Sequence, residues 1–311
     1  MKSYSELFKN APLRIVSRQS KLAMVQTEMV TALLGDIAYE ITGLSTSGDE
    51  VLDRPLVEIG GKGVFIKALE VELMEGRADC AIHSLKDMET IIAPQTAFQA
   101  VLPRADRRDA LVGPFATIDE LPQGAVIGTS SVRRAALLRH HRPDLEIALL
   151  RGNVQRRLSQ LEEGHFDAII LAKAGLDRLG LGHLGSPLDE KVMMPSASQG
   201  VIAIQISIKD STRKQAMQAL FDEMNCQDTY AAITAERSLL SKLDGSCRTP
   251  IGAMADLDDK GQITLHACVL SADGSARFDA TMKGSIDEAE RLGHEVGEAL
   301  LSQCGGRAFL A

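Results

Sequence analysis

The sequence predicts an α/β protein, with two α/β lobes around a cleft and a small C-terminal α+β domain. Short apolar runs alternate with amphipathic helical segments over most of the chain, which is typical of mostly parallel sheets. The last third instead carries alternating strands and a closing helix. A length of 311 residues leaves room for three domains. We expect the first lobe to comprise residues 1–103 with 200–220, the second lobe 104–199, and the α+β domain 221–311.

The first lobe is predicted from apolar runs that glycines and polar stretches interrupt. The expected strands are Leu13–Ser17, Ile37–Leu44 and Asp79–Ile82, and the expected helices are Lys21–Leu34 and Val64–Met74. Between them, Thr46–Gly63 is polar and glycine-rich without clear periodicity, so we expect a loop there. Gln199–Ile208 has a strand pattern, and we expect it to return to this lobe.

The same alternation predicts the second lobe, and a different pattern predicts the C-terminal domain. The expected strands of the second lobe are Ala125–Ile127, Leu145–Leu150 and Asp167–Leu171, and its expected helices are Arg133–His141, Val154–Glu163 and Ala174–Leu179. In the C-terminal domain we expect helices at Asp228–Leu240 and Asp287–Leu301 and strands at Ile263–Leu270 and Arg277–Lys283.

Composition excludes several classes of function. The net charge is -8, tryptophan is absent and aromatic residues make up 4%, which argues against a nucleic-acid partner. We identify no signal peptide, and no apolar stretch approaches the roughly 18 residues of a membrane span. The cysteines are odd in number and lack a Cys-x-x-Cys pair, so we expect no disulfide framework, no metal site and a cytoplasmic location. They are Cys80, Cys226, Cys247, Cys268 and Cys304.

A basic island interrupts this acidic chain between Gly128 and Arg157. Seven arginines against Asp144 and Glu146 give it a charge of +5. The arginines are Arg133, Arg134, Arg139, Arg142, Arg151, Arg156 and Arg157. Such a local charge indicates an anion site. The island opens with Gly128-Thr129-Ser130-Ser131-Val132-Arg133-Arg134, where a strand gives way to a helix whose N-terminus would offer N–H groups to an anion.

Position in the chain separates these arginines. Arg133, Arg134 and Arg151 follow strands, and ligands of open α/β sheets bind at the carboxyl ends of strands, so we expect these three to bind an anion. Arg156 and Arg157 are adjacent on a helix, so we expect at most one of them to point inward. The alternative is a solvated helix face with weak surface pairs. The arginines for which we expect that alternative are Arg139 and Arg142.

Two motifs of the first lobe also follow strands. His83-Ser84-Leu85-Lys86-Asp87 places a lysine and a carboxylate at a strand end, where they would bind an anion and stabilise a nearby cation. The alternative is a turn with a solvated ion pair, in which His83 is structural. Arg14-Ile15-Val16-Ser17-Arg18-Gln19-Ser20 ends the first strand, so Arg18 would contact an anion while Ser20 caps the next helix. The alternative for Arg18 is a surface arginine.

Two loops carry distinctive residues. Gly60-Gly61-Lys62-Gly63 lacks the spacing of a phosphate loop, so we interpret it as a hinge or lid and not as a nucleotide site. Asp244-Gly245-Ser246-Cys247-Arg248-Thr249-Pro250 places a cysteine beside an arginine, and a neighbouring cation favours a thiolate. From these residues alone, Cys247 is either reactive or inert. Cys80 and Cys268 lie in strand patterns, and we expect them to be buried and inert.

Taken together, these motifs resemble the porphobilinogen deaminase (hydroxymethylbilane synthase) family. The resemblance extends from about Leu13 to Ile251 and more loosely to the end of the chain. The motifs that carry it are Gly60-Gly61-Lys62-Gly63, His83-Ser84-Leu85-Lys86-Asp87, Gly128-Thr129-Ser130-Ser131-Val132-Arg133-Arg134, Leu150-Arg151-Gly152-Asn153-Val154 and Gly245-Ser246-Cys247-Arg248-Thr249-Pro250. Several independent motifs in the same order make the resemblance highly specific.

The resemblance implies a fold, a cofactor and a reaction. The two lobes would be similar to periplasmic anion-binding proteins, and a third domain would carry the cofactor. Cys247 matches the cysteine that holds a dipyrromethane through a thioether. The family condenses four porphobilinogen molecules head to tail, releases ammonia each time, and forms the linear tetrapyrrole hydroxymethylbilane on the route to haem. A monomer is the family expectation.

The resemblance also implies roles for single residues. Each porphobilinogen carries an acetate and a propionate, so several cations would be needed to hold the growing chain. Asp87 matches the catalytic aspartate, whose carboxylate would stabilise positive charge that develops on the pyrrole nitrogens. Lys62 would lie on a lid. The positions implied to bind the cofactor are Lys86, Thr129, Ser130, Ser131, Arg133, Arg134 and Gly152. The positions implied to bind substrate are Arg18, Ser20, Arg151, Arg157 and Arg178.

Three departures from the family pattern concern loop shape. Met88-Glu89 stands where Val-Pro often follows the Lys-Asp pair, Ser198-Gln199-Gly200 stands for a common Gly-Gln-Gly, and Ser246 replaces a frequent glycine.

Two other functions compete with the enzyme. A cytoplasmic anion-binding protein on the same two lobes would leave the loop cysteine and the Lys86–Asp87 pair unexplained. A nucleotide-dependent transferase would lack a phosphate loop.

Overall fold

The computed structural model describes residues 7–9, 11–46, 63, 66–243 and 249–310. Contacts between these residues divide the chain into two compact units. The first unit takes in the described residues up to 104 together with 201–230. The second takes in 105–200 and the described residues from 231 onward. Lys62, Ser246 and Cys247 lie outside the described residues. The division into three domains expected from the sequence stays a prediction.

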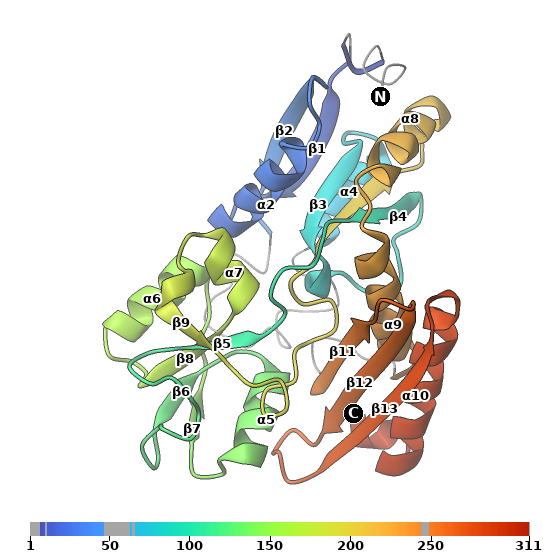
Figure 1. Cartoon of the computed structure of the whole chain (residues 1–311). Helices are drawn as coiled ribbons and strands as arrows, with labels where there is room; N and C mark the ends of the chain where they lie inside the picture. Colours follow the sequence, from blue (N-terminus) through green and yellow to red (C-terminus); the bar gives the residue numbers. More distant parts are fainter. Residues whose placement is uncertain (1–6, 10, 47–62, 64–65, 244–248, 311) are drawn as a thin grey trace. The chain divides into compact units, whose positions relative to one another are not determined.

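A five-stranded mixed sheet of order β2-β1-β3-β10-β4 forms the centre of the first unit (Figure 1). Its strands are β1 (Leu13–Arg18), β2 (Tyr39–Leu44), β3 (Cys80–Ser84), β4 (Thr96–Val101) and β10 (Ile202–Ser207). β1 pairs in parallel with β2 and β3, whereas β10 is antiparallel to β3 and β4. The expected return of Gln199–Ile208 to the first lobe is therefore confirmed, because β10 lies inside this sheet.

Helices cover both faces of this first sheet. They are α2 (Lys21–Thr31), α4 (Lys67–Glu75) and α8 (Ser211–Asp222). Side chains alternate between the two faces along a strand. Leu13 and Ile15 of β1 accordingly pack in one core with residues of α2 and α8, while Val16 packs in another core with Leu69 and Leu73 of α4. Apolar residues on both faces explain why the apolar residues of β1, Leu13, Ile15 and Val16, do not strictly alternate with polar ones.

The second unit contains another five-stranded mixed sheet, of order β7-β6-β8-β5-β9. Its strands are β5 (Asp109–Val112), β6 (Val126–Gly128), β7 (Glu146–Ala148), β8 (Ala168–Ala172) and β9 (Gly185–Pro187). β6 is parallel to β7 and β8, and β5 is antiparallel to β8 and β9. Asp109, the first residue of β5, pairs with Ala172, the last residue of β8. Asp109 therefore lies at the edge where the parallel strands end.

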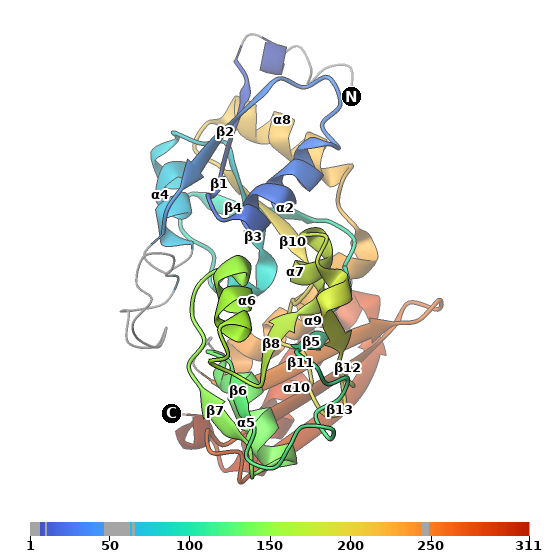
Figure 2. The same ribbon diagram turned by 90° about the vertical axis from the view of Figure 1, so that its left-hand side faces the viewer.

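Three helices pack on this second sheet. They are α5 (Val132–His141), α6 (Val154–Glu162) and α7 (Lys173–Arg178), followed by the short 3-10 helix η3 (Gly182–Leu184). Ile169 and Leu171 of β8 face α6 and α7, whereas Ile170, between them, packs against α5. Figures 1 and 2 show the sheet between α6 and α5. Each of the three helices directly follows a strand that ends at the same edge, which places the starts of α5, α6 and α7 together.

An antiparallel sheet of three strands closes the second unit, in the order β11-β12-β13. Its strands are β11 (Ile251–Leu257), β12 (Gln262–Leu270) and β13 (Arg277–Ser285), and its helices are α9 (Gln227–Leu243), which begins in the first unit, and α10 (Ala289–Cys304). Two short 3-10 helices, η4 (Ile286–Glu288) and η5 (Arg307–Leu310), flank α10. Both long helices pack with the sheet in one apolar core.

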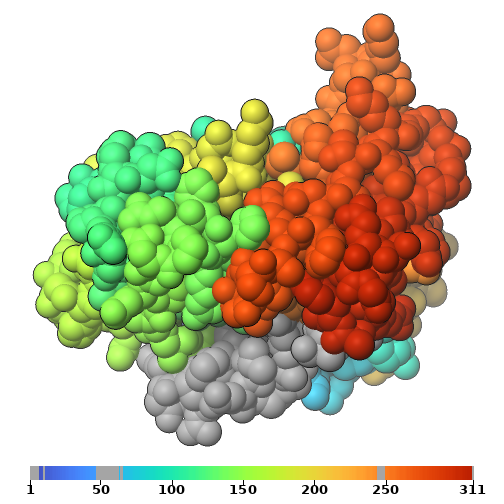
Figure 3. Space-filling model, turned by 90° about the horizontal axis from the view of Figure 1, so that it is seen from below, coloured from blue at the N-terminus to red at the C-terminus, as the bar shows by residue number. Residues whose placement is uncertain are grey.

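The C-terminal sheet also shares a core with the sheet that carries α5. Cys268 and Leu270 of β12 belong to the apolar cluster around α5, and Arg139 Nη1 donates to the carbonyl of Ala272 at 3.0 Å. Figure 3 shows green residues of the α5 region against orange residues of the C-terminal domain. This shared core is the physical reason why the two parts form one compact unit.

Candidate active site

Asp87 ends the single 3-10 turn η2 (Leu85–Asp87), which follows β3 directly. Two backbone bonds fix the turn: Leu85 N donates to Val201 O at 3.0 Å, and Met88 N donates to Leu85 O at 3.0 Å. Arg18 is the last residue of β1, the parallel neighbour of β3. Its Nη1 lies 3.7 Å from Asp87 Oδ2, and both side chains are partly exposed. An accessible carboxylate thus stands beside a cation at the carboxyl edge of the sheet.

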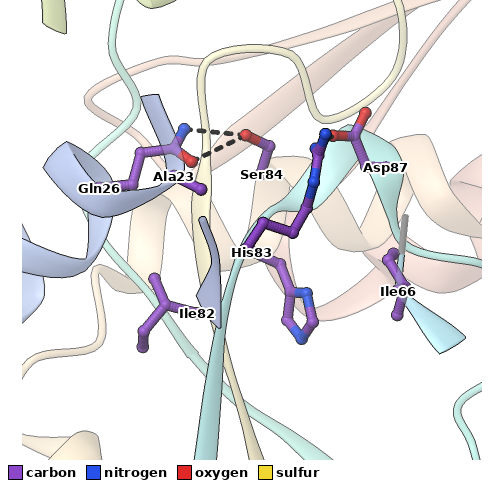
Figure 4. A pocket seen from close by; sticks show the side chains of 8 residues that line it. Ala23, Gln26, Ile66, Ile82, His83, Ser84 and Asp87 are labelled. Atoms are coloured by element: carbon purple, nitrogen blue, oxygen red, sulfur yellow. Dashed lines mark hydrogen bonds and ion pairs between the residues drawn. The ribbon is translucent and has the colours of Figure 1, made fainter. Parts of the chain in front are cut away.

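A small pocket adjoins this pair (Figure 4). Its lining residues are Arg18, Ala23, Gln26, Ile66, Ile82, His83, Ser84 and Asp87. Gln26 Nε2 donates to Ser84 Oγ at 2.8 Å, so α2 and β3 are tied together at the pocket. The ring of His83 points away from Asp87 in this view, and burial lowers the pKa of His83 to about 4. A neutral imidazole that faces the interior agrees with the structural role expected for His83.

Ser20 and Lys86 flank the same edge of the first sheet. Ser20 is the N-cap of α2, and its hydroxyl accepts a hydrogen bond from Ala23 N at 3.3 Å, so the expected cap is confirmed. Lys86 is exposed. The binding roles of both residues stay predictions.

The basic island begins at a polar turn between β6 and α5. Ser131 is the N-cap of α5, and its Oγ accepts from Arg134 N at 3.4 Å. The hydroxyl of Thr129 accepts from Ser131 N at 3.2 Å, and Thr129 N donates to Ala148 O at 3.0 Å. Thr129 is buried and Ser130 is half-buried. The helix start expected from the sequence therefore lies where the strand ends, with hydroxyl groups around it.

Arg133 and Arg134 are buried, with exposed fractions of 4% and 6%, and both bind Asp109, which is fully buried. Arg133 Nη2 lies 2.7 Å from Asp109 Oδ2, and Arg134 Nη2 lies 2.7 Å from Oδ1. Arg133 Nη1 also donates to Met194 O at 2.5 Å, and Arg134 Nη1 donates to Ile170 O at 2.8 Å. Burial lowers the pKa of Arg133, against the opposing effect of Asp109. Because a guanidinium has five N–H donors, each arginine retains donors for a further carboxylate.

A second polar turn, between β7 and α6, carries the next arginines. Arg151 is buried, and Gly152 has a φ of +104°, a conformation that side chains rarely adopt. Asn153 caps α6 by accepting from Arg156 N at 3.0 Å. Arg157 is half-buried and its Nε donates to Gly152 O at 2.8 Å, whereas Arg156 is exposed. The exposure of Arg156 agrees with the expectation that at most one of the adjacent pair points inward, and the binding role of Arg157 stays a prediction.

Arg178, the last residue of α7, has the least compensated charge in this region. Its Nη2 donates to the carbonyl of Gly200 at 2.6 Å. Its Nε is buried and, among the described residues, has no hydrogen-bond partner. Burial lowers the pKa of Arg178 to about 10, and no carboxylate of the described residues offsets this effect. We expect a half-buried guanidinium in this state to bind an anion.

The remaining arginines of the island bind protein groups near the surface. Arg142 pairs with Asp144 at 2.7 Å, and Arg139 contacts Ala272 as described above. Cys80 and Cys268 are buried, as expected, and burial raises the pKa of Cys268 to about 11. Within the described ranges, no group of three or more His, Cys, Asp or Glu side chains forms a candidate metal site. No helix in those ranges has the length and hydrophobicity to cross a membrane.

Two of the departures from the family pattern lie in the described residues. Met88 is buried. Ser198 has a φ of +63°, in the left-handed region that favours glycine, and its Oγ is buried without a hydrogen-bond partner among the described residues. Its backbone N donates to the buried carboxylate of Glu236 at 2.6 Å. A glycine at this position would therefore fit the backbone better than the serine.

The sequence did not single out Asp109 or Gln199. Gln199 Nε2 donates to Asp109 Oδ1 at 2.9 Å and to Arg107 O at 2.7 Å, so it joins the arginine cluster. A signal was present, since Asp109 is an ionisable residue at the head of the apolar run Ala110-Leu111-Val112. An acidic residue entering a buried strand requires cationic partners.

Comparisons with known proteins decide between the candidate functions. Residues 13–215 match the family model for the dipyromethane cofactor binding domain of porphobilinogen deaminase, and residues 230–302 match the model for its C-terminal domain. The porphobilinogen deaminase of Chromobacterium violaceum is 45% identical over 303 residues, which cover 96% of each chain.

The chain belongs to the porphobilinogen deaminase family. It is therefore a transferase of tetrapyrrole biosynthesis, and the cofactor of its matched domain is dipyrromethane.

Solved structures outside the porphobilinogen deaminase family show only distant likeness. The periplasmic VFT2 domain of Bordetella pertussis BvgS is 14% identical, with a TM-score of 0.42, and covers 76% of this chain and 98% of its own. The ancestral amino acid-binding protein AncCDT-1 is 12% identical, with a TM-score of 0.36, and covers 71% and 92%.

Proposed function

We propose that this chain adds four porphobilinogen molecules head to tail to a dipyrromethane held by Cys247, with Asp87 as the catalytic carboxylate. The product would be hydroxymethylbilane, and each addition would release ammonia. Family membership supports the reaction, and the residue roles rest on the arrangement of charges. The observation that carries them is that the buried guanidinium groups of Arg133 and Arg134 share one buried carboxylate, Asp109, in a protein whose net charge is -8.

The described residues fit a ligand with several carboxylates. Arg178 is half-buried and no carboxylate of the described residues offsets the effect of burial on its pKa, while Arg133 and Arg134 share the single carboxylate of Asp109. Charge-assisted hydrogen bonds contribute roughly 1.5–3 kcal/mol each, so a few such contacts are enough to hold a chain of carboxylated pyrroles. We assign cofactor carboxylates to Lys86, Arg133 and Arg134, with Thr129, Ser130, Ser131 and Gly152 around them. We assign substrate carboxylates to Arg18, Ser20, Arg151, Arg157 and Arg178, and a lid role to Lys62.

Asp87 supplies the electrostatic part of the reaction. When bound, the dipyrromethane offers the pyrrole carbon to which the first porphobilinogen is joined. Loss of ammonia would break a carbon–nitrogen bond and leave the incoming pyrrole electron-poor. A carbon–carbon bond would then form with a pyrrole carbon, and positive charge would develop on a ring N–H until that carbon loses its proton to solvent. The Asp87 carboxylate would accept a hydrogen bond from that N–H and stabilise the positive charge as it develops. Arg18 Nη1, 3.7 Å from Asp87 Oδ2, places a positive charge beside this carboxylate.

Intact-protein mass spectrometry tests this function. We expect the purified protein to carry a dipyrromethane adduct and to release ammonia when porphobilinogen is added. Cys247→Ala should lose both, whereas Cys304→Ala, which changes another cysteine, should retain both. An active protein with an unmodified Cys247 would contradict the proposal, and a protein that binds porphobilinogen without releasing ammonia would be an anion-binding protein instead.

We further propose a monomer in the cytoplasm, with no nucleic-acid or membrane partner.

A further inference from the structure

We propose that Asp109 is a positioning residue, which fixes the guanidinium groups of Arg133 and Arg134 so that they receive the carboxylates of the cofactor. The inference rests on the proposed function. Asp109 itself would touch neither cofactor nor substrate.

Asp109 contacts the two guanidinium groups through different oxygens. Its Oδ1 accepts from Arg134 Nε at 3.2 Å and Nη2 at 2.7 Å, and its Oδ2 accepts from Arg133 Nη2 at 2.7 Å. Gln199 Nε2 donates to the same Oδ1 at 2.9 Å. Each arginine also has one carbonyl anchor, Met194 O or Ile170 O. Both guanidinium groups are therefore held at two points, which removes most of their rotamer freedom before a ligand arrives.

The cluster lies where a helix favours anions, not cations. Arg133 and Arg134 belong to the first turn of α5, and this turn has no acidic residue. The helix dipole and the free N–H groups stabilise negative charge at this end. Within the cluster, Asp109 neutralises one of two arginine charges, so a charge of +1 is left. An arrangement that is unfavourable alone becomes favourable when a ligand carboxylate binds beside the helix start.

A second cluster in the protein has the same composition but lies elsewhere. Asp79 is buried and binds Arg14, whose Nη2 is 2.7 Å from Oδ1, and Arg213, whose Nε donates to Oδ1 at 2.8 Å. Burial alone would raise the pKa of Asp79, but these two arginines bring it below its ordinary value. Asp79 precedes β3, whereas Asp87 follows it. This cluster therefore lies at the end of β3 opposite to the end that carries Asp87. It provides a control with matched charge and a buried carboxylate, although its arginines are more exposed than Arg133 and Arg134.

The experiment compares wild type, Asp109→Asn and Asp79→Asn. For each protein, urea unfolding gives the stability without cofactor, and intact-protein mass spectrometry gives the fraction that carries the dipyrromethane mass under conditions in which the protein is folded. We expect both variants to be less stable, because each leaves two arginines without their buried carboxylate. We expect the loaded fraction to fall about tenfold or more in Asp109→Asn only. Asp79→Asn should load as wild type does.

The outcomes separate this inference from the proposed function. A wild type without adduct overturns the proposed function. A loaded wild type with equal loading in Asp109→Asn, or with equal losses in both variants, shows that Asp109 is structural only and overturns the inference. If Asp109→Asn does not fold, Asp109→Glu keeps the charge and displaces the carboxylate by one methylene. A folded Asp109→Glu with reduced loading supports positioning, and one that loads fully contradicts it.

Discussion

Asp87 and Arg18 illustrate what strand ends do for single residues. Arg18 ends β1 and Asp87 ends the turn η2 that follows β3, the parallel neighbour of β1, so their side chains reach the same edge without any long-range loop. The sequence predicted this edge for both residues, because each follows a short apolar run. It did not predict that Arg133 and Arg134 would share Asp109. The local pattern indicates that Asp109 needs cationic partners, but it does not say which ones, because β5 enters the sheet as an antiparallel strand.

Replacement of Asp87 by asparagine should remove catalysis while the shape of the site is kept. An amide presents half the acceptor capacity and no charge, so positive charge on the pyrrole nitrogens would be left without its counterion. We expect kcat to fall by about 10²–10³, as for the loss of one preorganised electrostatic group. Steady-state assays with porphobilinogen measure the effect, and Asp144→Asn, which changes a carboxylate paired with surface Arg142, is the control. A near-normal kcat would remove Asp87 from the mechanism.

Helices and strands with a clear hydrophobic periodicity were predicted well. Those that are stabilised mainly by tertiary contacts were not. The starts of β1, α2, α6 and β13 agree with the sequence. Prediction missed α8 and the strands β4, β5, β9 and β11, because these strands are short or polar at one end and gain their stability from neighbours. The mostly parallel sheets expected from the alternation are mixed, since β10 and β5 enter as antiparallel strands. Their direction depends on connections that local periodicity does not contain.

The packing of α10 on α9 depends on a glycine. A Cβ at Gly293 would lie 2.2 Å from Ala235 O and 2.7 Å from Ser238 Cβ. Helix propensity alone predicts that Gly293→Ala stabilises by about 1 kcal/mol. We expect the opposite, a loss of about 1–3 kcal/mol from overpacking, because the obstacle at α9 is backbone.

Chemical denaturation of Gly293→Ala measures that balance. The control is Gly284→Ala in β13, where a Cβ would meet Leu292 at an ordinary 3.5 Å, so we expect a change near zero. A more stable Gly293→Ala would show that the two helices separate at little cost.

The stability of the whole chain should depend on pH through a single buried imidazole. The pKa of His83 is about 4 in the folded state and near 6.5 when unfolded. The unfolded chain therefore binds a proton first as the pH falls, so the stability present above pH 6.5 is lost progressively between 6.5 and 4. At pH 5 the loss amounts to about 2 kcal/mol. Urea unfolding at pH 7 and pH 5 measures it, and His83→Asn should show a smaller difference between these two pH values. An unchanged difference would mean that other groups cause the pH dependence.

For the whole molecule, the order of the motifs along the chain was more informative about function than any single helix or strand. Charges at strand ends indicated an anion site, but they did not distinguish a binding protein from an enzyme. Cys247 and Asp87 made that distinction, and the chemistry of the Gly245-Ser246-Cys247-Arg248 segment is not described by any periodicity. The network of Asp109, Gln199 and the arginines depends on residues far apart in sequence, so only the folded chain brings it together.

The uncompensated guanidinium of Arg178 also bears on the lifetime of the protein in the cell. A folded state that holds a half-buried cation without a carboxylate partner is less stable than the same fold with an anion bound, and the stabilisation increases with the affinity for that anion. Newly made chains that have not yet acquired the cofactor would then open more often than finished enzyme. Proteases act on opened chains. Quality control would thus remove the chains that never became enzymes and leave the loaded ones, without a dedicated recognition signal.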